Sequence, residues 1–512
     1  MATPTLVGLR KLAGSYRARL GNGNRRQAQL GSRVIHCVCR EHRGCHHVEG
    51  CHGHSFARVT TKNAYQRAAI SSRSRLRDLI YKAEPMMAIE ISKNVERLIA
   101  SNDGHPDPSW ETHLRRHGPL PSPLSRSWDR GLLEEIERSG LTGRGGAGFP
   151  AYRKARLAQT NEHLILVVNA MEGEPASAKD RILVASSVQL VLDGAEVLAN
   201  ALCANQIVLC APEEPNAMAN CLVRALADRR SHVPLSISTV VRRLPAAYVA
   251  GEESALASGV AGDRGLPKNR PDKSVPLRIG REAALVHNVE TLAQVALIAR
   301  HGADWFRDVG SLDAPGTCLV TISGGVERPG VLEVATGTPV TEILELSRPI
   351  GRIQAILVGG YGGTWLARAD ADVAFAPGAL ADVGASMGAG VLVALPVDSC
   401  GIRETARIAS FMASESAGQC GPCFFGLPAI ADDLRGLALG TADRGTLDRL
   451  RSRCDVVVGR GACRHPDGVV RLVRSALDVF ADDVNSHARG VPCAGTRRLS
   501  VLTGRRSIKG RR

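Results

Sequence analysis

Apolar and polar positions repeat with two different periods in the middle of the chain. The runs HLILVVNA at 163–170, QIVLCAP at 206–212 and LSISTVV at 235–241 are short and apolar, and they predict strands. Residues 181–202 and 213–230 place apolar side chains at helical spacing and predict helices between those strands. Strand–helix–strand alternation of this kind is typical of a parallel α/β sheet.

A different pattern begins near residue 317. The segment 317–346 predicts a strand, a glycine-containing turn, a second strand and a helix, and 352–360 adds another strand. After Cys400 the pattern is helical, and the predicted helices are 401–414, 426–438, 443–453 and 467–486. Four helices with short connections predict a bundle.

Composition limits the number of domains and argues against nucleic acid as a partner of the folded body. The chain has 512 residues, 44% of them apolar, which is enough for two to four domains with substantial cores. Its net charge of +15 lies at the ends, since residues 1–85 hold 16 Lys and Arg against 4 Asp and Glu, and residues 488–512 hold 8 against none. Residues 86–487 hold 41 basic and 46 acidic residues, a net charge of −5, so we expect the folded body to bind no nucleic acid.

The first 85 residues form a basic leader in which cysteines alternate with histidines. The cysteines are Cys37, Cys39, Cys45 and Cys51. These residue types ligate zinc, but their spacing matches no common zinc knuckle. We expect the leader either to lack a fold or to lie upstream of a true start at Met86–Met87, and we expect a second basic tail at 489–512.

Neither a secretory signal nor a membrane span is predicted. The first 25 residues lack an apolar core of useful length, and no run approaches 18 apolar residues. The 14 cysteines do not follow a disulfide framework, which fits a reducing compartment. We therefore expect a cytoplasmic protein that reaches a membrane only peripherally, through a partner complex.

The loop GRGGAGFP at 143–150 is the first candidate for ligand binding. Its glycines are Gly143, Gly145, Gly146 and Gly148, three of them in the spacing G-x-G-x-x-G. Because a helical segment precedes the loop, it is not a dinucleotide fingerprint, which follows a strand. Glycines still let backbone N–H groups approach a phosphate, and Arg144 and Lys154 add positive charge. The alternative is a flexible surface turn.

Polar residues also follow the predicted strand 163–170, at the end where open α/β sheets bind ligands. Asn169 can hydrogen-bond the edge of a heterocycle, and Glu172 and Glu174 can accept hydrogen bonds from ribose hydroxyls. The Lys-Asp-Arg run at 179–181 can equally be an ordinary solvated charge run.

Two further motifs carry polar residues. AYVAGEESAL places Gly251, Glu252 and Glu253 at a predicted helix start, where the helix dipole favours carboxylates even without a ligand. HNVETL supplies Asn288 and Thr291. Each of these motifs taken alone is more often structural than functional.

Three cysteines near the C-terminus have the spacing of iron–sulfur ligands. Cys420 and Cys423 form C-x2-C, and Cys463 follows about forty residues later. A complete set needs four thiolates, and Ala417 occupies the position that would complete C-x2-C-x2-C. Three thiolates can hold a cluster with one labile iron, a three-iron cluster, or none.

Taken together, the motifs GRGGAGFP, NAMEGEP, YVAGEESAL, HNVETLA, GADWF and SAGQCGPC with its distant Cys resemble one family. That family is the flavin-carrying, NADH-oxidising 51-kDa or F subunit of respiratory complex I, with relatives in NAD-reducing hydrogenases and NAD-linked formate dehydrogenases. The resemblance covers about 130–487. It implies a Rossmann-like FMN/NADH domain at 86–310, a β-grasp (SLBB) domain at 311–398 and a helical iron–sulfur domain at 399–488.

The resemblance also implies roles for single residues. The glycines of 143–148 with Asn169, Asn288 and Thr291 look like FMN contacts. Phe149 resembles the aromatic residue that stacks on the NADH adenine, and Lys154 the basic residue beside flavin and NADH. The residues implied to line the nicotinamide–flavin pocket are Glu172, Glu174, Tyr248, Gly251, Glu252 and Glu253. We expect Glu172 and Lys154 to be the catalytic pair, and Cys420, Cys423 and Cys463 to be the metal ligands.

The chain departs from this family at several positions. Ala417 replaces the leading cluster cysteine, and Ser416 or Glu415 could offer an oxygen ligand in its place. Met171 replaces an Asp, and Leu157 stands where the family has a second adenine-stacking aromatic. Loss of one ring costs about 1 kcal/mol. FMN binding is therefore better supported than tight NADH binding.

The expected function is that of an NADH dehydrogenase that passes a hydride from NADH to FMN. Electrons would leave through a [4Fe–4S] cluster, if one assembles without a thiolate at position 417, toward a quinone-linked or other acceptor chain. A two-iron ferredoxin-like subunit or a soluble acceptor is the expected partner. The alternatives are a subunit of a formate- or hydrogen-linked dehydrogenase, and a redox-inactive scaffold that binds FMN or another nucleotide.

Overall fold

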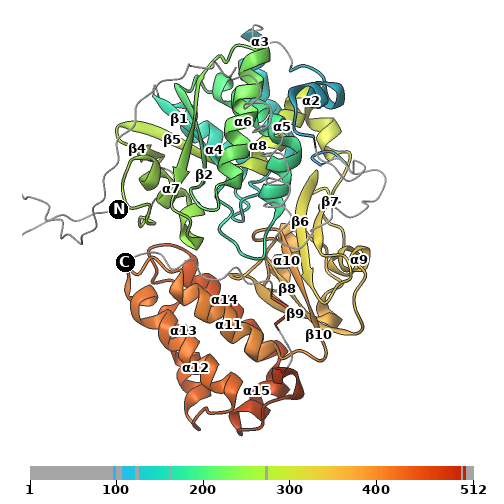
Figure 1. Ribbon diagram of the computed structural model, residues 1–512, viewed down its shortest axis with the longest axis vertical. Helices are drawn as coiled ribbons and strands as arrows, with labels where there is room; N and C mark the ends of the chain where they lie inside the picture. The colour runs from blue at the N-terminus through green and yellow to red at the C-terminus, as the bar shows by residue number, and fades with distance from the viewer. Residues whose placement is uncertain are drawn as a thin grey trace, which may run out of the picture. The chain divides into compact units, whose positions relative to one another are not determined.

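The computed structural model describes residues 96–99, 107–120, 126–161, 163–270, 272, 275–497 and 500–502 (Figure 1). The predicted leader at 1–85, with its cysteines and histidines, lies outside the described residues, as does part of the predicted tail at 489–512.

A five-stranded sheet lies at the centre of the first domain, with strand order β3-β2-β1-β5-β4. Its strands are β1 (Leu164–Asn169), β2 (Gln206–Pro212), β3 (Ser238–Leu244), β4 (Leu277–Ile279) and β5 (Glu282–Asn288). In this sheet β1, β2, β3 and β5 run parallel, and β4 at the edge is antiparallel to β5. The predicted parallel α/β sheet is confirmed, and its central strands are continuously apolar because helices bury both faces.

Two helical layers of unequal size cover this sheet (Figure 1). The larger layer contains α3 (Arg126–Ser139), α4 (Ala151–Gln159), α5 (Lys179–Ala201), α6 (Ala217–His232) and α8 (Val289–Arg307). It packs on the face that carries Leu164, Leu166 and Leu209. The short turn η1 (Tyr248–Gly251) and α7 (Glu253–Val260) cover the opposite face, around Ile165 and Val167.

α5 is a buried core helix that crosses α8 at very close range. A Cβ on Gly194 would stand 1.8 Å from the carbonyl oxygen of Leu292, so only glycine allows this crossing. Among the described helices α5 is the one that is long and apolar enough to cross a membrane by length and composition, but 78% of its apolar window is buried. The scattered polar residues of α5 interrupt its apolar run while its mean hydropathy stays at 1.6. The expectation that no segment spans a membrane stays a prediction.

The second domain is a mixed sheet with strand order β7-β6-β10-β8-β9. Its strands are β6 (Thr317–Gly324), β7 (Gly330–Ala335), β8 (Ile353–Val358), β9 (Thr364–Ala367) and β10 (Val391–Pro396). β6 and β10 are parallel, and the other neighbours are antiparallel. The helices α9 (Val340–Leu346) and α10 (Pro377–Asp382) share an apolar core with one face of the sheet. The predicted hairpin, helix and following strand are confirmed, and β9 and β10 complete the sheet.

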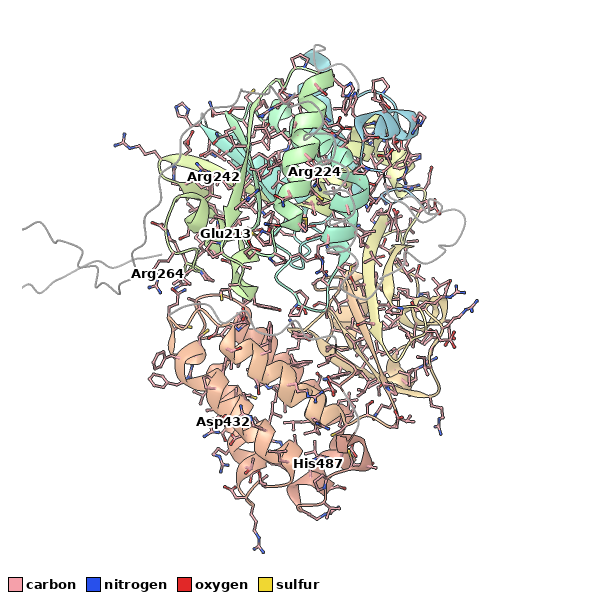
Figure 2. The ribbon with its side chains drawn as sticks, in the orientation of Figure 1. Glu213, Arg224, Arg242, Arg264, Asp432 and His487 are labelled. Carbon is pink, nitrogen blue, oxygen red and sulfur yellow. The ribbon has the colours of Figure 1, made fainter. Side chains whose placement is uncertain are left out.

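The third domain is helical, as predicted (Figure 1). Its helices are α11 (Gly401–Ser414), α12 (Leu427–Leu439), α13 (Thr446–Val457), α14 (His465–Val479) and α15 (Ala481–Ala488). A single π-helical turn at Pro422–Gly426 precedes α12. Figure 2 shows the side chains of this domain, with Asp432 on α12 and His487 on α15 labelled.

One predicted helix, at 467–486, is wrong. The chain leaves helical geometry at Phe480, where φ is −108° and ψ is 33°, and this residue separates α14 from α15. The Phe480 ring lies where a Cβ on Gly401 would stand, and it packs edge-to-face on Trp365 at 5.4 Å. Burial of this ring against α11 and β9 sets the break, and the helical periodicity of the sequence does not reveal it.

Hydrogen bonds tie the second sheet to both of the other domains. The N–H of Leu319 on β6 donates to Glu290 of α8 at 2.9 Å. The indole N–H of Trp365 on β9 donates to Thr405 of α11 at 3.0 Å. The β-grasp sheet therefore contacts the α/β domain through one strand and the helical domain through another.

Candidate functional site

Two asparagines mark the carboxyl ends of neighbouring strands at the centre of the first sheet. Asn169 ends β1 and Asn288 ends β5, and the two are register partners in the parallel pair. Strand order moves outward from β1 to β3 in one direction, and β5 lies on the other side of β1. The asparagines thus flank the point where the strand order reverses, which is where open α/β sheets bind ligands.

The glycine loop closes on itself beside Asn288. The N–H of Gly143 donates to the carbonyl of Phe149 at 2.8 Å, and Thr142 and Pro150 form an isolated bridge. A Cβ on Gly145 would stand 3.3 Å from the Cβ of Asn288. The loop is therefore pinned at its base and held against the sheet end, which argues against a flexible surface turn.

Thr291 fixes the same loop from α8. Its hydroxyl oxygen accepts the N–H of Arg144 at 2.9 Å, and the Thr291 side chain is fully buried. Asn288 caps α8 by accepting the N–H of Glu290 at 3.0 Å. The N-terminus of α8, the positive end of its dipole, is thus positioned next to the glycine loop.

The tip of the loop presents backbone donors to solvent. Gly145, Gly146, Ala147 and Gly148 are exposed, and within the described residues their N–H groups have no hydrogen-bond partner. Gly148 has φ +62°, and a Cβ on it would meet nothing within 4 Å. Unpaired amides beside a helix N-terminus form an anion-binding site, and a phosphate group fits this arrangement.

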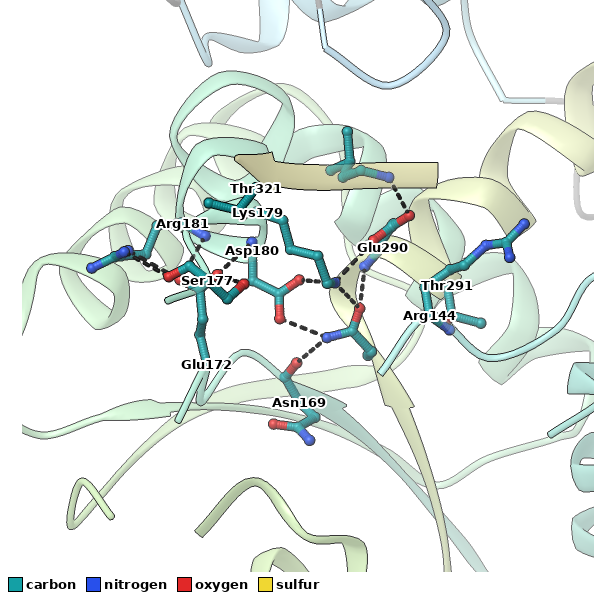
Figure 3. Close-up of polar contacts among 12 residues, drawn as sticks. Arg144, Asn169, Glu172, Ser177, Lys179, Asp180, Arg181, Glu290, Thr291 and Thr321 are labelled. Carbon is teal, nitrogen blue, oxygen red and sulfur yellow. Dashed lines mark hydrogen bonds and ion pairs between the residues drawn. The ribbon is translucent and has the colours of Figure 1, made fainter. Parts of the chain in front are cut away.

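Lys179, Asp180 and Glu290 form a buried ion network next to Asn169 (Figure 3). The ammonium of Lys179 is 2.6 Å from Asp180 Oδ1 and 2.9 Å from Glu290 Oε2, and it donates to Asn288 at 3.2 Å. Asn288 in turn donates to Asp180 Oδ2 at 2.7 Å. Although burial alone would lower the pKa of Lys179, Asp180 and Glu290 raise it above the ordinary value.

This network corrects one interpretation of the sequence. Lys179 and Asp180 are 3% and 4% exposed, so they do not belong to a solvated charge run. They are buried because each charge is paired and hydrogen-bonded. Sequence reasoning missed Glu290 as well, although it lies inside HNVETL between the two residues that were singled out.

Glu172 faces the start of α5. Its carboxylate accepts the N–H of Asp180 at 2.9 Å and the hydroxyl of Ser177 at 3.0 Å, and it pairs with Arg181 at 3.0 Å. Burial raises the pKa of Glu172, with Arg181 acting in the opposite direction. Its φ of +39° is rare for a residue with a side chain. The predicted catalytic carboxylate is therefore held in a strained backbone by partners within the chain.

Glu174 joins three parts of the structure. Its Oε2 accepts the hydroxyl of Tyr248 at 3.1 Å and the N–H of Tyr361 at 3.0 Å, and its Oε1 accepts the N–H of Ala176 at 3.2 Å. Burial raises the pKa of Glu174 to about 7, against the effect of these donors. The hydroxyl of Tyr248 and the carboxylate of Glu174 are thus hydrogen-bonded to each other. Their predicted contact with a nicotinamide stays a prediction.

Asn169 and the AYVAGEESAL motif meet at the opposite side of β1. The amide of Asn169 donates to the carbonyl of Gly251 at 2.9 Å and accepts the N–H of Met171 at 3.1 Å. Glu252 caps α7 by accepting the N–H groups of Ser254 and Ala255, both at 3.0 Å. Both residues therefore shape the backbone at the sheet end.

Lys154 is a partly exposed cation of this group. Its side chain is 22% exposed, and its ammonium pairs with Glu253 and donates to the carbonyl of Val286 at 2.5 Å. Next to Val286, the Nε2 of the buried His287 has no hydrogen-bond partner in the described part of the chain. Burial holds the pKa of His287 well below its ordinary value, and the charge of Lys154 adds to this effect. Sequence reasoning missed His287 because a single histidine before an asparagine carries no distinctive spacing.

Apolar surface borders the loop on its exposed side. Phe149 is 44% exposed and Leu157 is 37% exposed. The ring of Phe149 is accessible to a planar group such as the predicted adenine, and Leu157 can offer only an aliphatic surface.

The three predicted cluster cysteines come together between the helices of the third domain. Cys423 is buried, and Cys420 and Cys463 are half-buried. Burial and the neighbouring Cys420 raise the pKa of Cys423 to about 12, and burial also raises the pKa of Cys463. Burial works against the Cys420 thiolate too, but the N–H groups of Ala462 and Cys423 bring the pKa of Cys420 below its ordinary value.

The loop that carries Cys420 and Cys423 is docked on the α/β domain. Glu415 accepts the N–H of Tyr248 at 3.2 Å, and the side-chain amide of Gln419 donates to the carbonyl of Pro267. Glu415 therefore has a hydrogen-bond partner in the first domain, and its expected role as an oxygen ligand stays a prediction. Phe424 is 63% exposed and packs on Phe425.

The architecture is that of a nucleotide-binding α/β domain joined to a β-grasp domain and a cysteine-bearing helical domain. Residues 136–297 match the Nuo51 FMN-binding domain, 319–348 the SLBB domain, and 403–487 the NADH-ubiquinone oxidoreductase-F iron-sulfur binding region. The F subunit of the NADH-quinone oxidoreductase of Streptomyces coelicolor is 30% identical over 80% of this chain and 95% of its own length. The chain belongs to this family, the F subunits of NADH-quinone oxidoreductases, as the resemblance predicted.

Subunits of hydrogenases are also similar to this chain. The HndC subunit of the NADP-reducing hydrogenase of Solidesulfovibrio fructosivorans is 29% identical over 73% of this chain and 79% of its own length. A chain in the crystal structure of the NAD+-reducing [NiFe]-hydrogenase in the H2-reduced state superimposes with a TM-score of 0.66 and 30% identity, over 72% of this chain. The match spans 63% of that hydrogenase chain, which is less than two thirds of its length.

Proposed function

We propose that this chain is the FMN-dependent, NADH-oxidising component of a dehydrogenase. The observation that carries the proposal is the glycine loop, whose exposed amides lie beside the N-terminus of α8 and the in-register Asn169 and Asn288. Membership of the F-subunit family supports the same chemistry.

The loop amides of Gly145, Gly146 and Gly148 would hold the FMN phosphate, with the α8 dipole adding favourable potential. Lys154 lies on the same side and is accessible to a negatively charged group. When bound, FMN supplies hydride acceptance and one-electron release, which no amino-acid side chain provides. Asn288 and Thr291 position the loop and the helix N-terminus, and the Lys179 network keeps Asn288 in place.

The ring of Phe149 would stack on the adenine of the dinucleotide, and Glu253 would orient Lys154 beside it. Glu172 and Glu174 were expected to accept ribose hydroxyls, but both carboxylates already have partners within the chain. We propose that the chain prefers NADH to NADPH, because the negative charge of Glu172 and Glu174 would repel a 2′-phosphate. The test compares the rates at which NADH and NADPH reduce the bound flavin.

Electrons would leave toward Cys420, Cys423 and Cys463 and then to a redox partner protein. The docking of the cysteine loop on Tyr248 and Pro267 supports a short path between the two centres. A quinone-linked chain is the acceptor we propose, by analogy with the relatives from NADH-quinone oxidoreductases.

The test is an anaerobic titration of the full chain with NADH after reconstitution with FMN. We expect flavin absorbance that bleaches on addition of NADH, followed by an EPR signal if a cluster has assembled. A protein that binds no FMN after reconstitution contradicts the proposal. Bleaching without an EPR signal would favour a flavoprotein that lacks the onward cluster, an alternative that Ala417 specifically supports.

A further inference from the structure

A second group of metal-ligand side chains lies in the helical domain, away from the cluster cysteines. Cys400 precedes α11, His487 belongs to α15, and Cys493 follows α15 in the C-terminal segment. Their two sulfur atoms and one ring nitrogen all lie within 4.8 Å of one another. Cys400 precedes α11 and Cys420 follows it, so the two cysteines lie beyond opposite ends of this helix. Its 14 residues span about 21 Å, and this group is therefore separate from the cluster ligands.

The spacing of the group suits a single tetrahedral ion. Cys400 Sγ and His487 Nε2 are 3.6 Å apart. With zinc–sulfur and zinc–nitrogen bonds of ordinary length, the edge of a zinc tetrahedron between these atom types is about 3.6 Å. The thiolates of a four-iron cluster bind separate irons and are spread more widely, so the geometry favours one ion over a cluster.

The histidine is already oriented as a ligand. Its Nδ1 donates to the carbonyl of Leu437 at 3.1 Å, which leaves the lone pair on Nε2 directed toward the thiols. A carbonyl behind the ring is the usual support of a metal-bound histidine. His487 is fully buried, so it cannot rotate away without disturbing α12.

Cys400 lies at the N-terminus of α11, where burial raises the pKa of its thiol to about 12 and the N–H of Arg403 acts against that rise. It caps α11, and its sulfur accepts the N–H of Arg403 at 3.4 Å. The positive end of the helix dipole stabilises a negative sulfur at this position. Cys400 is 1% exposed, so the thiolate would remain shielded from solvent.

The C-terminal segment is held against the same point. A Cβ on Gly495 would stand 2.6 Å from the backbone nitrogen of Cys400, so the two backbones pack in contact. The N–H of Cys493 donates to His487 Nε2 at 3.1 Å, a contact that a bound ion would replace. Cys493 is half-buried, which leaves the ion a route to the group.

We propose that Cys400, His487 and Cys493 bind one zinc ion, with water at the fourth position, and that this ion fastens the C-terminal segment to the start of α11. Two thiolates and a neutral imidazole are the donor set that zinc prefers. Binding releases one proton from each thiol, so the site carries no net charge when Zn²⁺ is bound.

The first test is the zinc content of the full chain, expressed with added zinc and measured by elemental mass spectrometry. Because cysteines at 1–85 can also hold metal, the comparison is between variants. We expect Cys400→Ser with Cys493→Ser, and separately His487→Gln, to lose one zinc per chain. Cys454→Ala removes another buried cysteine of the same domain and is the matched control; it should keep the zinc. The triple variant Cys420→Ser, Cys423→Ser and Cys463→Ser should keep it as well.

A second measurement leaves Cys400, His487 and Cys493 unchanged, so its result does not depend on whether substitutions at these residues disturb folding. Zinc X-ray absorption is recorded on a protein in which the leader cysteines alone are replaced by serine. We expect two sulfur neighbours at about 2.3 Å and nitrogen or oxygen neighbours at about 2.0 Å. Removal of the zinc by a chelator should also speed proteolysis of the segment after residue 488. Absence of zinc from this protein, or a Cys400–Cys493 disulfide in its place, overturns the proposal, as does zinc content that is unchanged in the Cys400 and Cys493 variant.

Discussion

Ala417 lies in the turn between α11 and Cys420, where a fourth thiolate would complete the ligand set. The three remaining thiols lie near one another, since Cys420 and Cys463 both act on the pKa of Cys423, which burial raises most. The carboxylate of Glu415 accepts the N–H of Tyr248, and its use as a substitute ligand stays a prediction. One side chain thus separates this chain from the usual four-cysteine arrangement.

Restoring the thiol should restore a stable cluster. In Ala417→Cys we expect more iron per chain and a stronger EPR signal after reduction, because every cluster iron then has a protein ligand. Iron content and EPR are measured on anaerobically reconstituted protein. Ala417→Ser has nearly the same size without the thiol and serves as control. Equal iron content in the two variants would show that Ala417 does not limit cluster assembly.

Glu333 is a second residue whose effect can be isolated. It is buried on β7, its Oε2 accepts the N–H groups of Arg97 and Leu98 at 3.0 and 2.8 Å, and its Oε1 accepts the hydroxyl of Thr317 at 2.7 Å. Burial raises the pKa of Glu333 from 4.5 to about 7, against the effect of these donors. The folded protein therefore binds a proton that the unfolded chain has already lost between these pH values.

The sign of the pH effect follows from this proton. The contribution of Glu333 to the free energy of unfolding is largest below about pH 4.5 and falls as pH rises toward 7, by up to about 3 kcal/mol. Glu333→Gln should remove this part of the pH dependence, which denaturant unfolding at pH 5 and pH 8 would measure. An identical slope in both proteins would contradict the assigned protonation.

At the level of elements, the crossing of α5 and α8 holds the nucleotide-binding face together. Gly194 allows the backbones to touch, and its neighbour Asp193 pairs with Arg229 at 2.7 Å and Arg300 at 2.5 Å. Burial alone would raise the pKa of Asp193, but His113 and the two arginines lower it to about 2. Close packing and paired charge therefore fix α8, whose N-terminus faces the glycine loop.

Gly194→Ala should separate the two helices. Because its Cβ would stand 1.8 Å from Leu292 O, we expect a loss of about 3 kcal/mol in the free energy of unfolding, and weaker FMN binding. Gly436→Ala is the matched control on α12, where the nearest atom to a Cβ is 3.9 Å away. That change should stabilise the protein by up to about 1 kcal/mol. Similar effects of both substitutions would show that the crossing tolerates a methyl group.

For the whole molecule, the proposed electron path depends on how the helical domain docks on the α/β domain. The contacts of the cysteine loop are polar, with Glu415 on Tyr248 and Gln419 on Pro267. The ring of Tyr248 also packs on His465 of α14 at 5.3 Å. The cysteine loop thus contacts the nucleotide-binding domain as well as its own helices.

Glu415→Ala should loosen this docking without unfolding either domain. We expect faster amide hydrogen exchange in residues 415–423 and slower reduction of an external acceptor relative to flavin reduction. Exchange in α5 and β1 should not change. Glu342→Ala, an exposed carboxylate on α9, is the control. Unchanged exchange in the loop would show that Glu415 does not hold it.

Local spacing in the sequence determined a large part of this protein. The strands β1 and β2, the long helix α5, the order of the three kinds of domain and the cysteine spacing all follow from residues close together in the chain. The strands β4, β5, β9 and β10 escaped prediction, and β4 and β9 have too few residues for a period to show.

Only the tertiary structure decided which groups are the partners of the buried polar side chains. Lys179 and Asn288 are 109 residues apart, yet they share one network, and Cys400 meets His487 across 87 residues. Glu172 and Glu174 look like free acids in the sequence, but the fold supplies each with donors. The physical reason is that a buried charge must be matched by whatever group the fold brings beside it, and sequence spacing carries no record of that neighbour.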